Sequence, residues 1–519
     1  MSASREKKLR QEMAASGTPD PKKVRQEEER LKQRRANRLY ALIAIIFVLV
    51  AAVVLIWNSN VIQRSATAAT VDGVKYSAAE VDYYYHGRFN SLLQNQYASY
   101  LGISSGMDMN TKVSDTAKMF LPDITGDDVT WDAYLKDYAI KSLATVTKLN
   151  NLAKEKGYTF TEEMQKQMDD TIASVKSTAS SAGVSVSTYL KAIYGKNVTQ
   201  GIFTRMLKDS IMASQYDSDY EESLSYTDEQ IEAYYQEHQN ELDVASYEYI
   251  YFNGTAPTTK DADGNTVDAT DEEKAAAKEA AHTAAAEALD RLNAGESLEE
   301  IAKSYEIATY TVQGEGTYST SAVGEWIFNA DRVEGDVSIV ESDPSTYLVL
   351  FHSRHINDYK TVNIRHILFQ TDTTGLDSES DTYEADLEKA QAAAKQKAEE
   401  ALIKWKAGDA TEDSFAAMAN EVSEDPGSNT NGGLYSQVTK GEMVAAFNNW
   451  IFDENRQVGD TGVVETSYGA HAMYFSGWDV PYWKLTAENA LRSTEYSEWG
   501  QSLIKDLDVK QGFGMKFVG

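Results

Sequence analysis

The chain has no cysteine, and this absence removes several classes of chemistry. Disulfide bonds, thiolate metal ligands, cysteine nucleophiles and lipid-modified cysteines are all excluded. The absence does not identify the compartment in which the protein resides. The rest of the composition, with 42% hydrophobic and 25% charged residues over 519 positions, is ordinary for a folded protein. A chain of this length indicates roughly two to four domains.

Positive charge is scarce in most of the chain, whose formal net charge is -31. Residues 1–38 are the exception, because they hold 12 Lys/Arg against 6 Asp/Glu. The remainder carries -37, which argues against nucleic acid as a partner of the main body.

Charged residues and prolines are both absent from Leu39–Trp57, a run of 19 residues. At about 1.5 Å per residue a helix of this length nearly spans a hydrocarbon core of ~30 Å, so the run predicts a transmembrane helix. Basic residues crowd its N-terminal side, and we expect residues 1–38 to form a cytoplasmic arm. A single-pass protein of the cell membrane, with residues 58–519 extracytoplasmic, follows from this orientation.

A cleaved secretory signal is the alternative interpretation of this run. The small residues Ala66–Ala68 resemble a cleavage site. The basic segment and the apolar run are both too long for a signal peptide, however, so an uncleaved anchor is favoured. Residues 58–519 lie outside the cytoplasm under either interpretation.

Residues 58–245 are expected to form a mainly helical domain. Thr130 is a typical N-cap for a helix ending near Gly157, and Thr227 begins a capping box with Gln230. Residues 479–519 contain one more amphipathic pattern, and we expect this C-terminal helix to pack on the helical domain.

A tandem repeat occupies the chain from residue 246 onward. The segment "SYEYIYF" at 246–252 matches "NIRHILF" at 363–369, and 326–351 matches 450–475 without a gap, with 9 of 26 positions identical. Two α+β domains are therefore predicted, at 246–358 and 359–478.

The second repeat holds two histidines that the first repeat lacks. His366 and His471 occupy predicted strand positions where the first repeat has Tyr249 and Tyr347. The first repeat also lacks counterparts of the Gly-Gly loop near residue 432 and of the segment "GEMVAAF" at 441–447, which we expect to be a helix. This pattern predicts that the first repeat keeps only a binding or scaffolding role.

Six segments of the second repeat carry a family resemblance: "IRHILF", "SEDPGS", "NGG", "GEMVAAF", "GDTGVVET" and "YGAHAMYF". In this order and spacing, residues 361–477 resemble the parvulin-type peptidyl-prolyl cis-trans isomerases. The whole architecture resembles membrane-anchored foldases of the PrsA/SurA type. The resemblance implies an α+β multidomain fold with an N-terminal transmembrane helix, a helical SurA-N-like chaperone domain, two tandem parvulin-like domains of which the first is degenerate, and a C-terminal helix.

The resemblance also implies which residues carry the chemistry. It places a catalytic pair at His366 and His471, with Asp425 and Thr466 completing their network. Tyr435 falls where relatives usually have a pocket leucine. Met443 and Phe447 stand four apart, a spacing that would put both on one face of a helix, where they suit a slot for a proline ring. We expect these last three residues to bind substrate.

The expected function is isomerisation of X-Pro bonds in translocated proteins by an extracytoplasmic, membrane-anchored foldase that also binds unfolded chains. A membrane-tethered holdase with vestigial isomerase domains is the alternative. The partners would be unfolded or newly translocated polypeptides and the membrane, through residues 39–57. No cofactor or metal is expected, and the sequence makes no prediction of oligomeric state.

Three other interpretations are disfavoured. Residues 370–386 contain no Lys or Arg, so the loop after His366 cannot supply a basic pocket for phosphorylated substrates. A metal cluster of His352, His355 and His366 lacks a well-placed further ligand. The acidic stretch 261–272 resembles a calcium loop, but Thr266 stands where such a loop needs glycine.

Overall fold

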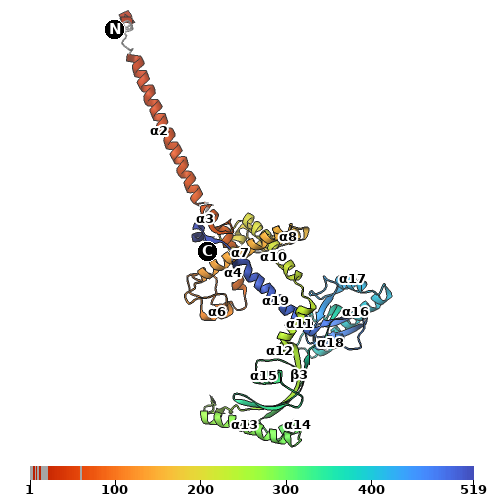
Figure 1. The fold of residues 1–519 in the computed structure, drawn as a ribbon. Helices are drawn as coiled ribbons and strands as arrows, with labels where there is room; N and C mark the ends of the chain where they lie inside the picture. The colour runs from red at the N-terminus through yellow and green to blue at the C-terminus, as the bar shows by residue number, and fades with distance from the viewer. Residues whose placement is uncertain (1–3, 6, 9–10, 13–20, 59–60, 506) are drawn as a thin grey trace. The chain divides into compact units, whose positions relative to one another are not determined.

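The computed structural model describes residues 4–5, 7–8, 11–12, 21–58, 61–505 and 507–519 (Figure 1). Part of the basic arm, residues 1–3, 6, 9–10 and 13–20, therefore lies outside the described residues. By compactness the chain divides into two units, Met1–Leu224 with Tyr496–Gly519 and Ser225–Glu495. The boundary after Leu224 comes before residue 245, at which the sequence pattern places the end of the helical domain.

The apolar run belongs to a long helix, α2 (Pro21–Asn58), which begins within the basic segment. Residues 22–38 are mostly Lys, Arg, Glu, Gln and Ala, which favour helix, and proline suits the first helical position. Among the described residues one helix is long and apolar enough to cross a membrane. This candidate span is Arg30–Val54, which contains an apolar window with a mean hydropathy of 2.4 and no burial against the rest of the chain.

The first unit is built mainly of helices. Its long helices begin at side-chain caps, as the sequence predicted for Thr130, whose hydroxyl accepts a hydrogen bond from the amide of Ala133. The helices are α3 (Val61–Ser65), α4 (Ala78–Gln94), α5 (Ala98–Leu101), α6 (Asp115–Phe120), α7 (Trp131–Glu155), α8 (Glu162–Ser181), α9 (Val186–Tyr194), α10 (Gln200–Ser223) and the 3-10 helix η1 (Phe513–Phe517).

A small sheet in this unit joins distant parts of the chain. Its strands are β1 (Thr67–Val71), β2 (Val74–Ser77) and β13 (Val509–Gln511), in the antiparallel order β13-β1-β2. Buried Asp82 of α4 accepts hydrogen bonds from the amide of Gly519 (2.9 Å) and from Asn197 (2.8 Å). The C-terminal segment is thus part of the core of the first unit.

The second unit contains two four-stranded antiparallel sheets with equivalent order, β6-β3-β8-β7 and β10-β9-β12-β11. The first comprises β3 (Asp243–Phe252), α13 (Asp271–Asn293), α14 (Leu298–Ala302), β6 (Ala308–Thr317), α15 (Ala322–Ile327), β7 (Val337–Ser342) and β8 (Ser345–Ile356). The second comprises β9 (Lys360–Gln370), α16 (Tyr383–Ala407), α17 (Glu412–Val422), β10 (Leu434–Val438), α18 (Ala445–Ile451), β11 (Thr461–Thr466) and β12 (Gly469–Pro481).

The two sheets also share their strand register. Tyr251 lies opposite Tyr347 in the first sheet, and Leu368 lies opposite His471 at the corresponding position of the second. A sheet position in one repeat therefore has a defined counterpart in the other.

Each sheet is covered by helices on both faces. In the second sheet, Ile367 and Ala472 pack toward α16 and α17, whereas Ile364, Met473 and Phe475 pack toward α18. Side chains alternate between the two faces along a strand, so residues two or four positions from Ile364, Met473 or Phe475 on the same strand also face α18.

Two short helices and one long helix complete the second unit. They are α11 (Asp228–Glu237), α12 (Gln239–Leu242) and α19 (Tyr482–Lys505), whose second half belongs to the first unit. Trp483 packs with Ile231 and Leu242. Near the other end of α19, Leu503 packs with Leu149 and Tyr216 of the first unit.

The acidic stretch 261–272 forms the turn of a small hairpin, β4 (Thr259–Lys260) with β5 (Thr266–Val267), and the start of α13. The Asp261 carboxylate accepts hydrogen bonds from the amides of Asp263 and Asn265 and from the Asn265 side chain. Its oxygens are thus used by the turn itself.

Candidate active site

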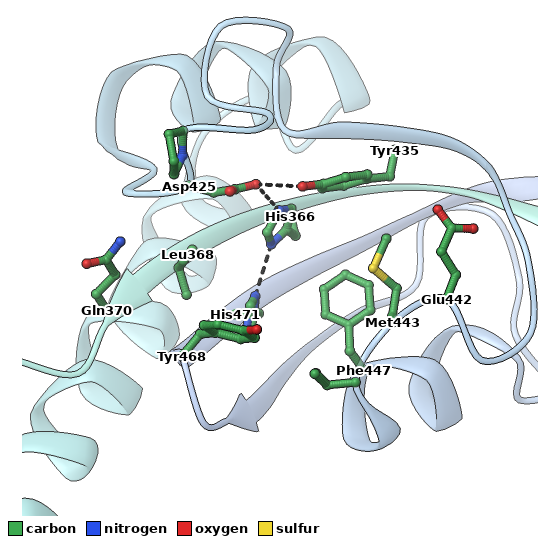
Figure 2. A pocket seen from close by; sticks show the side chains of 12 residues that line it. His366, Leu368, Gln370, Asp425, Tyr435, Glu442, Met443, Phe447, Tyr468 and His471 are labelled. Carbon is green, nitrogen blue, oxygen red and sulfur yellow. Dashed lines mark hydrogen bonds and ion pairs between the residues drawn. The ribbon is translucent and has the colours of Figure 1, made fainter. Parts of the chain in front are cut away.

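Two buried histidines meet on the α18 face of the second sheet (Figure 2). His366 of β9 and His471 of β12 are 4% and 5% exposed, and their Nδ1 atoms lie 3.0 Å apart. The alternation of the strands explains this position, because both residues are in phase with the side chains that pack toward α18.

Asp425 holds the outer nitrogen of His366. It lies in the turn that follows α17, and its Oδ2 is 2.8 Å from His366 Nε2. The same oxygen accepts hydrogen bonds from the hydroxyls of Ser428 (2.5 Å) and Tyr435 (3.1 Å), and Oδ1 accepts one from the amide of Gly427. Burial disfavours the charged carboxylate, but the hydrogen bonds from Ser428, His366 and Gly427 outweigh it and lower the pKa of Asp425 to about 2.

Thr466 holds the outer nitrogen of His471. It is the last residue of β11, next to the hairpin turn, and its Oγ1 lies 2.8 Å from His471 Nε2. The Thr466 hydroxyl also accepts a hydrogen bond from the amide of Tyr468 in the turn. The chain of polar contacts therefore runs from Asp425 through both histidines to Thr466.

The ionised Asp425 determines which nitrogen of each histidine carries a proton in this series of polar contacts. A carboxylate only accepts, so His366 must carry its proton on Nε2 and accept at Nδ1. His471 then donates from Nδ1 and accepts at Nε2, where the Thr466 hydroxyl donates. Both imidazoles are neutral in this arrangement, and each has one defined tautomer.

The pKa values of the two histidines agree with neutral rings. Burial, and after it the neighbouring His366, lower the pKa of His471 to about 4, although Asp425 opposes the change. Burial also lowers the pKa of His366, although the hydrogen bond and charge of Asp425 act against it. Near neutral pH neither ring takes up a second proton.

An apolar wall stands beside the pair. The ring of Phe447 meets His366 and His471 edge-on, with centroid distances of 5.5 and 5.3 Å. Phe447 and Met443 line a cavity of about 470 Å³ that also exposes both histidines, Asp425 and Tyr435. The structure thus brings all seven predicted site residues together, six of them on the cavity and Thr466 behind His471.

The prediction that a helix covers residues 441–447 is wrong about where the helix begins. α18 begins at Ala445, so Met443 lies in the turn before the helix and does not share a helical face with Phe447. The turn nevertheless directs Met443 to the same cavity. Gly441, with φ of +84°, and the bond from its amide to the Asn448 side chain shape this turn.

Ser428, which is not among the predicted site residues, is fully buried between Asp425 and His366. A serine three residues after an aspartate in "DPGS" is a typical turn position, and this signal could have found it. Six further residues line the cavity without having been predicted from the sequence: Leu368, Gln370, Pro426, Glu442, Val444 and Tyr468.

The Gly-Gly loop positions His366 through backbone contact. Gly432 and Gly433 have φ of +75° and +69°, and the Gly433 carbonyl accepts a hydrogen bond from the His366 amide (2.9 Å). A side chain at Gly433 would meet the His366 carbonyl oxygen at 2.2 Å. Glycine is required here by both the backbone conformation and the close approach.

The first repeat lacks this arrangement at the matching positions. Tyr249 and Tyr347 contact each other, with ring centroids 5.5 Å apart. The expectation that this repeat has no counterpart of the Met/Phe helix is wrong, since α15 precedes β7 as α18 precedes β11. When the gapless match of 326–351 with 450–475 is extended toward the N-terminus, Ser319 aligns with Met443 and Val323 with Phe447, so the helix is present without the Met/Phe pair.

Residues 349–475 match the family of PPIC-type PPIase domains. The second sheet and its helices form a parvulin-type peptidyl-prolyl isomerase domain. The resemblance that the six segments indicated is confirmed for this part of the chain, which is a peptidyl-prolyl cis-trans isomerase domain. No curated protein matches the chain.

Several solved structures are similar to this isomerase chain at low identity. PrsA of Bacillus subtilis is 14% identical over 73% of this chain and 89% of its own, with a TM-score of 0.30. A SurA-like chaperone of Campylobacter jejuni is 14% identical over 85% of this chain and 97% of its own, with a TM-score of 0.18. The PrsA peptidyl-prolyl isomerase of Bacillus anthracis is 18% identical over 29% of this chain, with a TM-score of 0.18. The match covers only 58% of the length of that PrsA chain.

Proposed function

We propose that His366, His471, Asp425 and Thr466 form the catalytic network of the isomerase, and that Met443, Phe447 and Tyr435 hold the substrate. The observation that carries the proposal is the histidine pair in its fixed tautomers beside an apolar wall, inside one cavity of the matched domain.

Rotation about an X-Pro bond is slow because it destroys amide resonance, at a barrier of about 18 to 20 kcal/mol. No covalent bond needs to form, and the enzyme has only to bind the twisted amide more tightly than either planar form. Each ~1.4 kcal/mol of such preference accelerates the reaction about tenfold.

Each part of the cavity has a defined task under this proposal. Phe447 and Met443 bury the proline ring and exclude water from the amide, whose polar planar form is then less stabilised. The neutral histidines present a fixed set of hydrogen-bonding groups and do not attack the substrate. Asp425 and Thr466 act as positioning residues, because they reach the substrate through the histidines.

Substrates carrying phosphoserine or phosphothreonine are excluded by this proposal. Among the described residues, the charged side chains on the cavity are Asp425 and Glu442, and no Lys or Arg lines it. A dianionic phosphate would meet two carboxylates and no cation, which is unfavourable.

We further propose that α2 anchors the isomerase in a cell membrane, with residues 58–519 on the extracytoplasmic side. Leu42, Phe47 and Val48 of α2 are 57%, 74% and 65% exposed, as side chains that face lipid would be. The basic arm that precedes the apolar run supports a cytoplasmic N-terminus. Newly translocated proteins would then be the substrates.

The catalytic proposal is tested with a proline-limited refolding assay on the full-length protein in detergent. We expect the wild-type protein to accelerate refolding and the His366→Ala/His471→Ala variant to lose most of this acceleration. Equal acceleration by both proteins would contradict the proposed roles of the pair. A His352→Ala variant is the matched control, because His352 belongs to the first repeat.

A second activity, binding of unfolded chains, is favoured by an exposed aromatic cluster in the helical unit. Tyr97, Tyr100 and Phe120 contact one another although they are 44%, 62% and 47% exposed, and neighbouring Met119 is 83% exposed. Exposed apolar groups that lie together are typical of interaction sites. The double histidine variant should still suppress aggregation of an unfolded protein, and loss of this suppression would contradict a separate holdase activity.

A further inference from the structure

Two carboxylates line the isomerase cavity, and they are used differently. Asp425 accepts four hydrogen bonds within the catalytic network. Glu442 lies toward the other side, next to Met443 and away from Gln370 (Figure 2). It is exposed, and among the described residues no Lys or Arg forms an ion pair with it.

The Glu442 carboxylate is held in place by its own turn. Its Oε2 accepts hydrogen bonds from the amide and the hydroxyl of Thr439, at 2.8 and 3.1 Å. Lys440, the lysine nearest in sequence, lies instead over the ring of Tyr359, with its Nζ 4.6 Å from the ring centroid. A carboxylate held in place therefore lies at the edge of the cavity, and no Lys or Arg in the described part of the chain pairs with it.

The charge of Glu442 acts inside the cavity. Burial raises the pKa of the Tyr435 hydroxyl, and the charges of Asp425 and then Glu442 raise it further. The surrounding domain adds to the same field, because residues 359–478 contain 20 Asp/Glu against 9 Lys/Arg. Such a field attracts cations and repels anions.

We propose that Glu442 makes this isomerase selective for prolines flanked by Lys or Arg. The inference rests on the proposed function of the cavity and names the substrate class it takes. With proline against Met443 and Phe447, the aliphatic stem of an adjacent basic residue lies along Val444, which is 39% exposed, and its charged end reaches Glu442. An acidic residue at the same place is repelled by Glu442 and Asp425.

The test measures kcat/KM of the full-length protein in detergent with three short peptides that have uncharged ends and differ in the residue before proline: Lys, Ala or Glu. A second set places the same residues after proline. For at least one position we expect the Lys peptide to exceed the Glu peptide by about three- to tenfold at low salt, and less at high salt.

Variants assign the preference to Glu442. Glu442→Gln should reduce the Lys/Glu ratio toward one, and Glu442→Lys should invert it. A glutamine carbonyl can still accept both hydrogen bonds from Thr439, so the turn is kept in the first variant. Glu388→Gln on α16 is the matched control, since Glu388 is exposed but does not line the cavity, and it should keep the wild-type ratio.

The outcomes separate this inference from the proposed function. Acceleration of the Ala peptide with equal rates for Lys and Glu peptides at both positions, or an unchanged ratio in Glu442→Gln, overturns the selectivity and leaves the isomerase site intact. Absence of acceleration for every peptide overturns both.

Discussion

Asp425 controls the protonation of two imidazoles although it contacts only one of them. Its charge selects the tautomer of His366, and the Nδ1–Nδ1 contact of 3.0 Å passes the selection to His471. Networks of this kind hold a buried polar group in one geometry, at a cost if any member is left unpaired. The loss of one member of this network should therefore change both the isomerase rate and the stability of the domain.

Isomerase activity should be independent of pH between about 6 and 8 and fall as the pH approaches 4. The unfolded chain protonates His471 near 6.5, whereas the folded chain does so only near 4. Acidification between these values thus favours unfolding, by up to about 3 kcal/mol for this residue. Refolding catalysis measured against pH checks this, and an inflection near 6.5 would contradict neutral histidines with lowered pKa values.

Thr466→Val should lower both the rate and the stability of the isomerase domain. The substitution removes the hydroxyl that donates to His471 Nε2 and leaves a buried nitrogen unpaired, which costs about 1–3 kcal/mol. Thr466→Ser keeps the donor and serves as the control. Hydrogen exchange of peptides from residues 359–478, measured with increasing urea, reports the loss, and equal protection in both variants would contradict the role of the hydroxyl.

The residues of the site could be predicted from the sequence to different extents. His366 and His471 were found because the repeat supplied a second copy without them, and Asp425 and Thr466 because the six segments resembled a family. Ser428 could not be predicted as a site residue because its contacts depend on how a turn folds onto His366. The acidic character of Glu442 was visible in the sequence, but its place on the cavity was not.

At the scale of elements, the isomerase sheet depends on a close backbone approach at β9. The carbonyl of Gly433 accepts a hydrogen bond from the His366 amide. Gly433 has a left-handed backbone conformation and leaves no room for a side chain. The pairing of β10 with β9 therefore directly sets the position of His366, which we propose to be catalytic.

Gly433→Ala should destabilise the isomerase domain by more than the usual penalty for this backbone conformation. An L-residue with such a φ costs about 1–2 kcal/mol, and the contact at 2.2 Å adds to it. Gly375→Ala is the matched control, because Gly375 has φ of +80° with nothing within 4 Å of the added carbon. The urea-dependent hydrogen exchange described above compares the two, and similar losses would contradict a specific contact at His366.

Elements with strong local signals were predictable, and those set by turns or distant pairing were not. Thr130 and Thr227 are caps in the structure as in the sequence pattern. The start of α18 was misplaced because the apolar spacing of Met443 and Phe447 is compatible with helix, whereas Gly441 and its turn decide otherwise. Strand β13 has only three residues and carries no usable pattern.

For the molecule as a whole, we expect residues 58–519 to lie outside the cytoplasm. Protease added to intact cells that produce the chain should remove an epitope placed after residue 519 and spare one placed before residue 1. The basic arm and the apolar run of α2 are the physical reason. Removal of the C-terminal epitope only after lysis would contradict this topology.

The discontinuous first unit also imposes an order on biosynthesis. Strand β1 pairs with β13, so the sheet that follows α2 stays incomplete until residue 511 has been synthesised. The whole of Ser225–Glu495 is made before that strand exists. Until then the edge of β1 is open, and Asp82 lacks the amide of Gly519. During synthesis this strand edge therefore stays unpaired until β13 has been made, and an unpaired strand edge is a site at which chains can aggregate.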